Sequence, residues 1–331
     1  MTPRQLAIGL GLSLGLGASL LGASLLGATD AAAAYPERPI TLVVPFAPGG
    51  ANDSVARLVG NKLGALLGQN VVVENRPGGG TTIGTAAVAR ARPDGHTLLL
   101  VSAAHTITPH LLKSVPYRTL QDFAAISQLT RTAYVMVTGA TSSFQRVADF
   151  TAKAQTPDGQ ITFASSGTGS APHLAGQLFA ILAGVRAAHV PYQGGAPALI
   201  GVLRADVDFY FSSISGARSL IESGQLRAIG VSSEKRLSLL PDLATMSELG
   251  LAGFAIDGWY GIIGPAGLPA DIVATLAAAI SKALHDPELV ERLKLEGEEI
   301  VASSPEAFDS ALRRDVERYG RIIADVGWKP H

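Results

Sequence analysis

Short apolar runs alternate with longer amphipathic stretches along most of the chain. The apolar runs predict strands over residues 40–46, 71–74, 97–102, 133–138, 161–165, 187–191, 207–211 and 226–232. Helical spacing predicts helices over residues 55–67, 82–90, 172–182, 197–204 and 217–222, and over the remainder of the chain after residues 259–264. Such alternation is typical of βαβ units, so the pattern predicts two α/β lobes with largely parallel sheets.

The amino terminus departs from this pattern. After Arg4, residues 5–29 form an uncharged run of mostly Leu, Ala, Gly and Ser, and a small-residue segment ending at Ala34 follows. This arrangement predicts a signal peptide cleaved after Ala34 and export to the periplasm. The alternative is an uncleaved membrane anchor, because the run is long enough to span a bilayer. No other segment approaches a membrane span.

Two predicted strands end in loops of small and helix-capping residues. The first loop runs from Pro45 to Ser54, and the second from Ser166 to His173. Glycines let a backbone approach a ligand closely, and the first turn of a helix presents unpaired N–H groups and a positive dipole end. Either loop alone could be a capped turn, but the pair favours a site that grips one carboxylate from two lobes.

Composition and charge narrow the function classes. The 331 residues are 47% hydrophobic and 16% charged, with 37 Gly, no Cys and a net charge of -1. Near-neutral charge gives no drive toward nucleic acid. The lack of cysteine excludes disulfides, thiolate metal sites, cysteine nucleophiles and lipoprotein anchoring.

Enzyme motifs are weak or absent. The run from Gly78 to Gly84 lacks dinucleotide-binding spacing, and no phosphate-binding loop or HExxH motif occurs. The seven histidines are scattered, so we expect no metal, no cofactor and no catalytic residues. One enzyme class stays open as an alternative, a secreted hydrolase that uses Ser166 or Ser170 with His173.

An ordered set of segments resembles a known family. The segments are residues 35–40, 45–57, 73–78, 92–99, 166–173, 192–195 and 259–265. Together they resemble the Bug family, also called TctC-type receptors, which are the extracytoplasmic solute-binding components of tripartite tricarboxylate transporters. The resemblance extends from about Tyr35 to Trp328, nearly the whole mature chain.

The resemblance implies a two-lobed type II periplasmic binding protein fold. Each lobe would be a mostly parallel sheet flanked by helices, with crossover strands as the hinge. It implies lobe 1 over residues 35–137 plus 258–331, and lobe 2 over 138–257. A small carboxylate would lie between the lobes, held mainly by backbone amides and bridging waters. The implied partners are this ligand and the transporter's membrane subunits, and we expect a monomer that binds no nucleic acid.

The same resemblance assigns ligand-binding positions. In lobe 1 these are Phe46, Ala47, Pro48, Gly49 and Gly50, with Asp53 as the cap. In lobe 2 they are Ser166, Gly167, Thr168, Gly169, Ser170, His173, Tyr192, Gly194 and Ser212. The chain departs from the family pattern at two points, with Ser212 where Asp is usual and Gly78-Gly79-Gly80-Thr81 where Gly-Ala-Gly-Gly is usual. A receptor that signals to a partner without any transporter is a further alternative.

Overall fold

The computed structural model describes residues 35–157, 159–237 and 239–325. The described residues from Pro36 onward form one compact unit. The predicted signal peptide, residues 1–34, lies outside the described residues, so its cleavage after Ala34 stays a prediction. Within the described ranges, no helix combines the length and the hydrophobicity that crossing a membrane requires.

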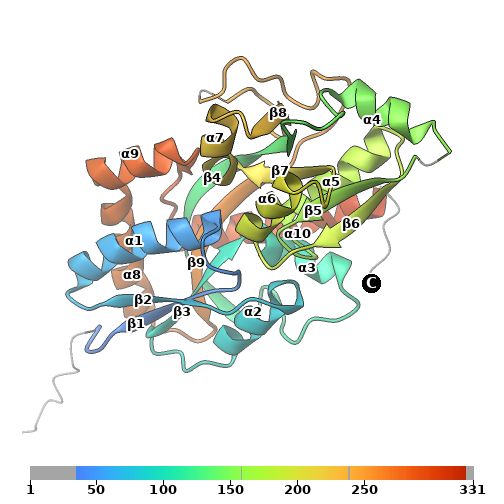
Figure 1. Cartoon of the computed structure of the whole chain (residues 1–331). Coiled ribbons are helices and arrows are strands. Elements are labelled where there is room, and N and C mark those ends of the chain that lie inside the picture. Colours follow the sequence, from blue (N-terminus) through green and yellow to red (C-terminus); the bar gives the residue numbers. More distant parts are fainter. Residues whose placement is uncertain (1–34, 158, 238, 326–331) are drawn as a thin grey trace, which may run out of the picture. The chain divides into compact units, whose positions relative to one another are not determined.

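A mixed sheet runs through this unit in the order β2-β1-β3-β9-β4-β7-β5-β6, and β8 and β10 also pair with β4 (Figure 1). The strands are β1 (Ile40–Val44), β2 (Val71–Asn75), β3 (Thr97–Ser102), β4 (Phe123–Gly139), β5 (Ile161–Ser165), β6 (Ala187–Pro191), β7 (Phe209–Ser213), β8 (Leu226–Val231), β9 (Asp257–Pro265) and β10 (Glu299–Ile300). Parallel pairs lie at both ends of this order, and antiparallel pairs lie in its middle.

One end of the sheet, the β1 half, consists of β1, β2 and β3 with the helices beside them. Strand β1 pairs in parallel with both β2 and β3. The helices are α1 (Ala51–Leu67), α2 (Thr82–Ala89), α3 (Ala104–Leu111), α8 (Ala270–Leu284) and α9 (Pro287–Leu295), with a 3₁₀ turn at Gly79–Thr81. Val55, Val59 and Leu63 recur every fourth residue of α1 and are fully buried. Their burial fixes α1 so that its first turn follows the carboxyl end of β1.

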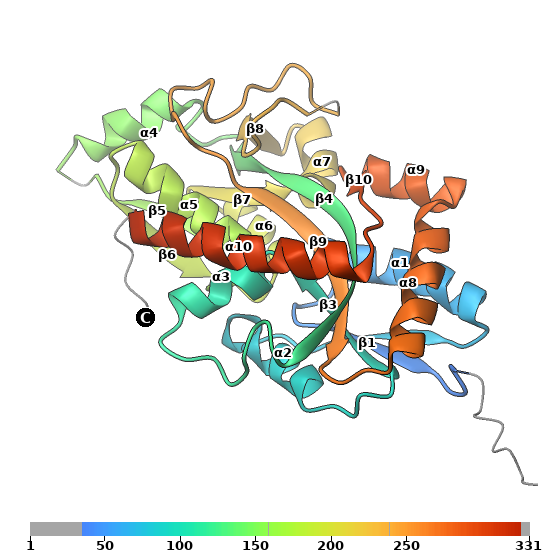
Figure 2. The ribbon, with the colours of Figure 1, turned by 180° about the vertical axis from the view of Figure 1, so that it is seen from behind.

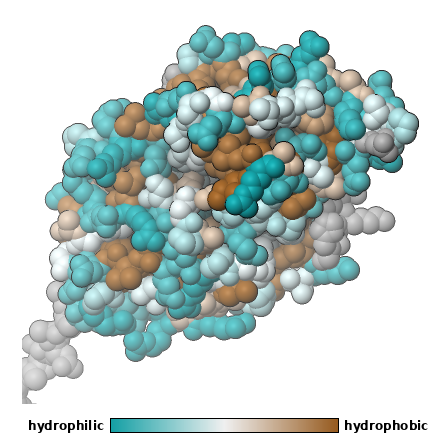
Figure 3. Space-filling view, viewed as in Figure 1, coloured by the Kyte–Doolittle hydropathy of each residue, from teal (hydrophilic) through white to brown (hydrophobic). Residues whose placement is uncertain are grey.

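The other end, the β5 half, consists of β5, β6, β7 and β8 with their helices. Strand β5 pairs in parallel with β6 and β7. The helices are α4 (Val147–Ala154), α5 (Ala171–Leu182), α6 (Gly195–Leu203) and α7 (Ile214–Glu222). Phenylalanines fill the core beneath α5, with the rings of Phe179 and Phe209 in edge-to-face contact and their centres 5.0 Å apart. Figure 3 shows apolar surface over α6, where Ile200 and Leu203 are exposed.

The long strands β4 and β9 join the two halves. Strand β4 pairs antiparallel with β9 over its first part and with β7 and β8 over its second part. The last helix, α10 (Pro305–Asp325), lies across these strands on the side seen in Figure 2. Ser304 begins this helix by accepting a hydrogen bond from the amide of Ala307 at 3.2 Å.

The predicted α/β class is confirmed, and β3, β5 and β6 have the predicted bounds. The prediction of strand 133–138 covered only the second part of β4, and it left out α3 and α4. Because β4, β8, β9 and β10 run antiparallel to their partners, the sheet as a whole is mixed, with the parallel pairs confined to the two ends.

Candidate functional site

The first turns of α1, α5, α6 and α7 converge on one small cavity between the β1 half and the β5 half. This inner cavity, about 30 Å³ in volume, is lined at these helix starts by Ala51, Asn52, Ala171, Pro172, Gly195 and Ser213. The volume holds about two waters or one carboxylate group. Each helix follows a strand of the sheet, so the sheet itself aims these helix starts at the same point.

No charged side chain lines the inner cavity; the other residues of its wall are Phe46, Ser102, Ser166, Ser170 and the tyrosines 134, 210 and 260. The positive potential therefore comes from helix dipoles and from N–H groups. A helix start carries roughly half a positive charge, and several of them around one cavity favour an anion.

Several amides of these first turns are unused. Within the described part of the chain, the backbone N–H groups of Ala51, Asn52, Gly195 and Ala196 have no hydrogen-bond acceptor. In the same part of the chain, Oδ1 of Asn52, a buried acceptor, has no hydrogen-bond partner either. Ala51 is buried and the other three residues are partly buried, so their open N–H groups are suited to donating to an anion.

The loop before α1 is braced by Asp53. Its Oδ2 accepts from the amide of Gly49 at 3.0 Å and from Nε of Arg57 at 3.0 Å, and its Oδ1 accepts from Nδ2 of Asn75 at 3.0 Å. Burial alone would raise the pKa of this carboxyl, but the hydrogen bonds from Arg57, Gly49 and Asn75 lower it below its usual value. Asp53 thus shapes the loop and is absent from the lining of the cavity.

The loop before α5 also uses its glycine amides internally. The amide of Gly167 donates to Oγ of Ser165 at 3.1 Å, and that oxygen lies 2.6 Å from Nε2 of His189. The amide of Gly169 donates to Nδ1 of His173 at 3.2 Å. With φ of 132° at Gly167 and 85° at Gly169, the loop needs backbone that other residues rarely adopt. The glycines therefore give this loop its shape, and the free donors lie in the adjacent helix turns.

This arrangement bears on the hydrolase alternative. The imidazole of His173 accepts from a backbone amide of its own loop. The hydroxyl of Ser170 donates to the carbonyl of Gly167 and caps α5. The close serine–histidine contact is instead between Ser165 and His189, and Ser165 is fully buried. The geometry gives these side chains a role in holding the loop.

A wider outer cavity, about 160 Å³, adjoins the inner one and shares Phe46 and Ser166 with it. Gly167, Thr168 and Tyr192 line it from the β5 half, and the 78–81 segment lines it from the β1 half. No charged side chain lines this cavity either. Together the two cavities make one uncharged cleft that can hold a small molecule.

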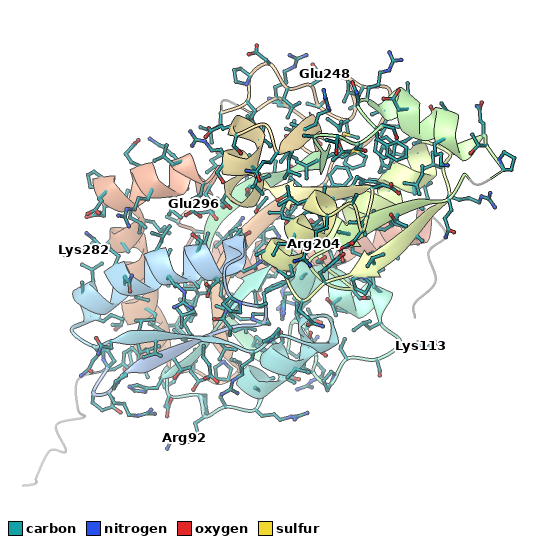
Figure 4. All side chains as sticks on the ribbon, in the orientation of Figure 1. Arg92, Lys113, Arg204, Glu248, Lys282 and Glu296 are labelled. Carbon is teal, nitrogen blue, oxygen red and sulfur yellow. The ribbon has the colours of Figure 1, made fainter. Side chains whose placement is uncertain are left out.

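Contacts across the cleft are close. The amide of Ala47 donates to the carbonyl of Gln193 at 2.9 Å. A Cβ placed on Gly80 would lie 2.5 Å from the carbonyl oxygen of Thr168. Behind α1, within the β1 half itself, Ser54 donates to Oε1 of Glu296 at 2.6 Å, and Figure 4 shows Glu296 between α9 and α1. The first two contacts bring the two halves together across the cleft.

Three tyrosines form a part of the wall that the sequence did not predict. Tyr134, Tyr210 and Tyr260 come from β4, β7 and β9 and are buried. Burial raises the pKa of each phenol above its usual value. These hydroxyls therefore stay protonated and can donate hydrogen bonds at physiological pH.

The predicted site residues divide into those that line the cleft and those that shape it. Phe46, Ser166 and Ser170 line the inner cavity, while Gly167, Thr168 and Tyr192 line the outer cavity. The rest shape the loops, namely Ala47, Pro48, Gly49, Gly50, Asp53, Gly169, His173 and Gly194. Ser212 donates to the carbonyl of Ser213, and its neighbour Ser213 lines the cavity instead. In the described ranges no three His, Cys, Asp or Glu side chains come together as metal ligands.

Comparison with known proteins places this chain in a family. A model described as the tripartite tricarboxylate transporter family receptor matches residues 55–328. A UPF0065 protein of Pseudomonas sp. strain P51 is 38% identical over 88% of this chain and 87% of its own length. BugT of Bordetella pertussis is 32% identical over 89% of this chain and 91% of its own length.

Solved structures agree with these sequence matches. The periplasmic binding protein BugD is 34% identical, with a TM-score of 0.85 over 90% of this chain and 100% of its own. MatC of Rhodopseudomonas palustris with bound malate is 30% identical, with a TM-score of 0.84 over 87% of this chain and 100% of its own. The fold is that of the two-lobed periplasmic binding proteins. The chain belongs to the tripartite tricarboxylate transporter receptor family, the TctC or Bug solute-binding receptors.

Proposed function

We propose that this receptor captures a small organic carboxylate in the inner cavity, in the periplasm, for delivery to the membrane subunits of a tripartite tricarboxylate transporter. The observation that carries the proposal is the convergence of the first turns of α1, α5, α6 and α7 on one cavity without a charged side chain. The ligand carboxylate accepts from the open amides of Ala51, Asn52, Gly195 and Ala196.

The strength of such a site fits a transport receptor. A hydrogen bond to a charged group contributes about 1.5–3 kcal/mol, so a few amide donors supply the greater part of a micromolar affinity of about 8 kcal/mol. A buried arginine or lysine would be left without a partner when the ligand leaves, and an unpaired buried charge is costly. Neutral amide donors hold the anion without this cost. Release then needs only the halves to separate, because donors come from both.

Separation of the halves requires a hinge, and we assign it to β4 and β9. Lobe 1 comprises residues 35–137 and 258–331, and lobe 2 comprises residues 138–257. Both boundaries fall within these two strands or at their ends. The hydrogen bond from Ala47 to Gln193 spans the two lobes and breaks when they open.

Relatives with known ligands support the carboxylate class. A Rhodopseudomonas palustris protein, Rpa4515, which carries adipate, is 27% identical with a TM-score of 0.85 over 90% of this chain and 100% of its own. MatC carries malate. Both ligands are small carboxylates, and the uncharged cleft of this chain can hold one carboxylate group.

Calorimetry tests the proposal. Mature protein, stripped of bound cargo by unfolding and refolding, is titrated with adipate, malate, succinate, acidic amino acids and aromatic acids. At least one carboxylate should bind with micromolar or better affinity, and no binding to any of them would refute the proposal.

A pair of variants on α1 locates the site. Asn52→Asp places a negative charge in the inner cavity, and like charges about 4 Å apart repel by about 4 kcal/mol at an effective dielectric constant of 20. Affinity should fall at least ~100-fold, while the acidic residue in the first helical turn leaves folding intact. Asn61→Asp makes the same change at an exposed position of the same helix and should bind normally. Equal affinity in both variants would place the ligand elsewhere.

A further inference from the structure

A third cavity lies on the opposite face of the strands that join the two halves, away from the cleft. This hinge cavity, about 210 Å³, is enclosed by β4, β9 and one face of α10. Trp259 lines it, whereas the next residue, Tyr260, lines the inner cavity. Successive residues of a strand point to opposite faces of a sheet, so β9 separates the two cavities.

The wall of the hinge cavity is charged, in contrast to the cleft. Arg131, Arg314 and Arg318 contribute guanidinium groups, and Asp257 and Asp315 contribute carboxylates. Within the described ranges, none of these five side chains forms an ion pair shorter than 4.0 Å with another residue. Opposite charges that share a cavity without pairing leave room for a molecule that carries both signs.

The carboxylates of Asp257 and Asp315 form the negative side of the hinge cavity. Oδ2 of Asp315 accepts from Nε1 of Trp259 at 2.6 Å, which leaves its other oxygen open. The carboxylate of Asp257 has no hydrogen-bond donor among the described residues. Burial raises the pKa of both groups, and the positive charges of Arg318 and Arg131 offset this increase only in part. A cation between them would restore the lost solvation, and an ammonium has three donors for these oxygens.

The arginines differ in how far they are engaged. Arg318 donates to the carbonyl of Ala255 at 3.1 Å and lies over the ring of Tyr319. Arg131 and Arg314 are exposed at the rim and make no side-chain hydrogen bond within the described residues. Guanidinium groups bind carboxylates in a two-point geometry, so the rim is suited to an anionic group.

We propose that the hinge cavity binds an α-amino acid as its zwitterion, with the ammonium between Asp257 and Asp315 and the carboxylate on Arg131 and Arg314. The side chain of the amino acid lies against Phe308 and Leu312, the apolar part of the wall. This site is separate from the cleft and does not rest on the function proposed for the cleft.

Trp259 provides a direct readout. The chain has two tryptophans, so a Trp328→Phe variant labelled with 5-fluorotryptophan gives a single ¹⁹F resonance from the wall of the hinge cavity. This mature protein is titrated with L-leucine, L-phenylalanine and L-glutamine. At least one should shift the resonance saturably. The absence of a saturable shift with all three, up to tens of millimolar, would overturn the proposal.

Matched analogues and variants test the charge pattern. For leucine, 4-methylpentanoate lacks the ammonium and 3-methylbutylamine lacks the carboxylate, and each should bind at least 10-fold more weakly than the amino acid. Asp257→Asn and Arg314→Gln should each weaken binding at least 10-fold, whereas Asn52→Asp in the cleft should leave the shift unchanged. An analogue that binds as well as leucine, or a shift that vanishes in Asn52→Asp, would contradict the site.

Discussion

Closure of the cleft depends on glycine at position 169. Gly169 has φ of 85°, and a Cβ there would lie 2.5 Å from Oγ1 of Thr108 and 3.2 Å from its Cα and Cβ. Rotation of the threonine relieves only the first contact, because the Cα belongs to the backbone of α3 in the β1 half. In Gly169→Ala the two halves must therefore separate locally by a few tenths of an ångström, which lengthens the hydrogen bonds that span the closed cleft.

The cost to ligand binding follows from that displacement. Weakening of the hydrogen bonds to a charged ligand by about 1.5 kcal/mol in total is a factor of roughly 10 in Kd. The positive φ adds about 1 kcal/mol of backbone strain, and this strain acts on stability. Gly68→Ala is the matched control, because Gly68 has φ of 69° and a Cβ there would meet nothing within 4 Å.

The assay combines calorimetry with thermal unfolding. Both variants should lose about 1 kcal/mol of unfolding free energy, and only Gly169→Ala should lose ligand affinity. Equal affinities in the two variants would show that the contact between Gly169 and Thr108 does not govern closure.

Two further predictions concern buried acidic and phenolic groups. Burial raises the pKa of Glu298 to about 8, so the folded protein keeps a proton that the unfolded chain releases above about pH 4.5. The free energy of unfolding, measured by urea titration, should therefore fall as the pH rises from about 5 to 8. Glu298→Gln should flatten this pH dependence. A slope unchanged in Glu298→Gln would assign the pH dependence to other groups. Tyr210→Phe removes one hydroxyl from the wall of the inner cavity and should weaken carboxylate binding about 5- to 10-fold by calorimetry, whereas Tyr117→Phe, buried outside the cleft, should bind normally. Equal affinity of the two tyrosine variants would show that the Tyr210 hydroxyl does not contact the ligand.

Much of the fold could be predicted because parallel strands buried on both faces are continuous apolar runs. Strands β3 and β5 are of this kind, and their predicted bounds match the structure. The first part of β4 escaped prediction because its buried residues include Gln128, Thr130 and Thr132. The hydrogen-bond partners of these side chains lie far away in the sequence; for example, Glu298 accepts from Oγ1 of Thr130 at 2.6 Å. Such pairing between residues far apart in the sequence leaves no local pattern.

The sequence indicated the two loops that border the candidate cleft, but not which of their groups line it. The loops at Gly49 and Gly169 stand at the ends of strands, and cap-forming residues mark the helix starts after them. Acceptors far away in the sequence decide which N–H groups are left without a hydrogen bond. The carbonyl oxygen of Gln193 accepts from the N–H of Ala47, whereas the N–H groups of Ala51 and Asn52 in the first turn of α1 have no acceptor. The tyrosines of the wall come from three strands far apart in the chain, and only the assembled sheet brings them together.

Capture of the ligand by backbone amides is tested most directly by a crystal structure of the mature protein with the carboxylate that calorimetry finds to bind most tightly. We expect a carboxylate group in the inner cavity, with its oxygens about 2.7–3.1 Å from amides in the first turns of α1 and α6. A ligand carboxylate paired with an arginine or lysine side chain, or bound outside the cleft, would contradict amide capture.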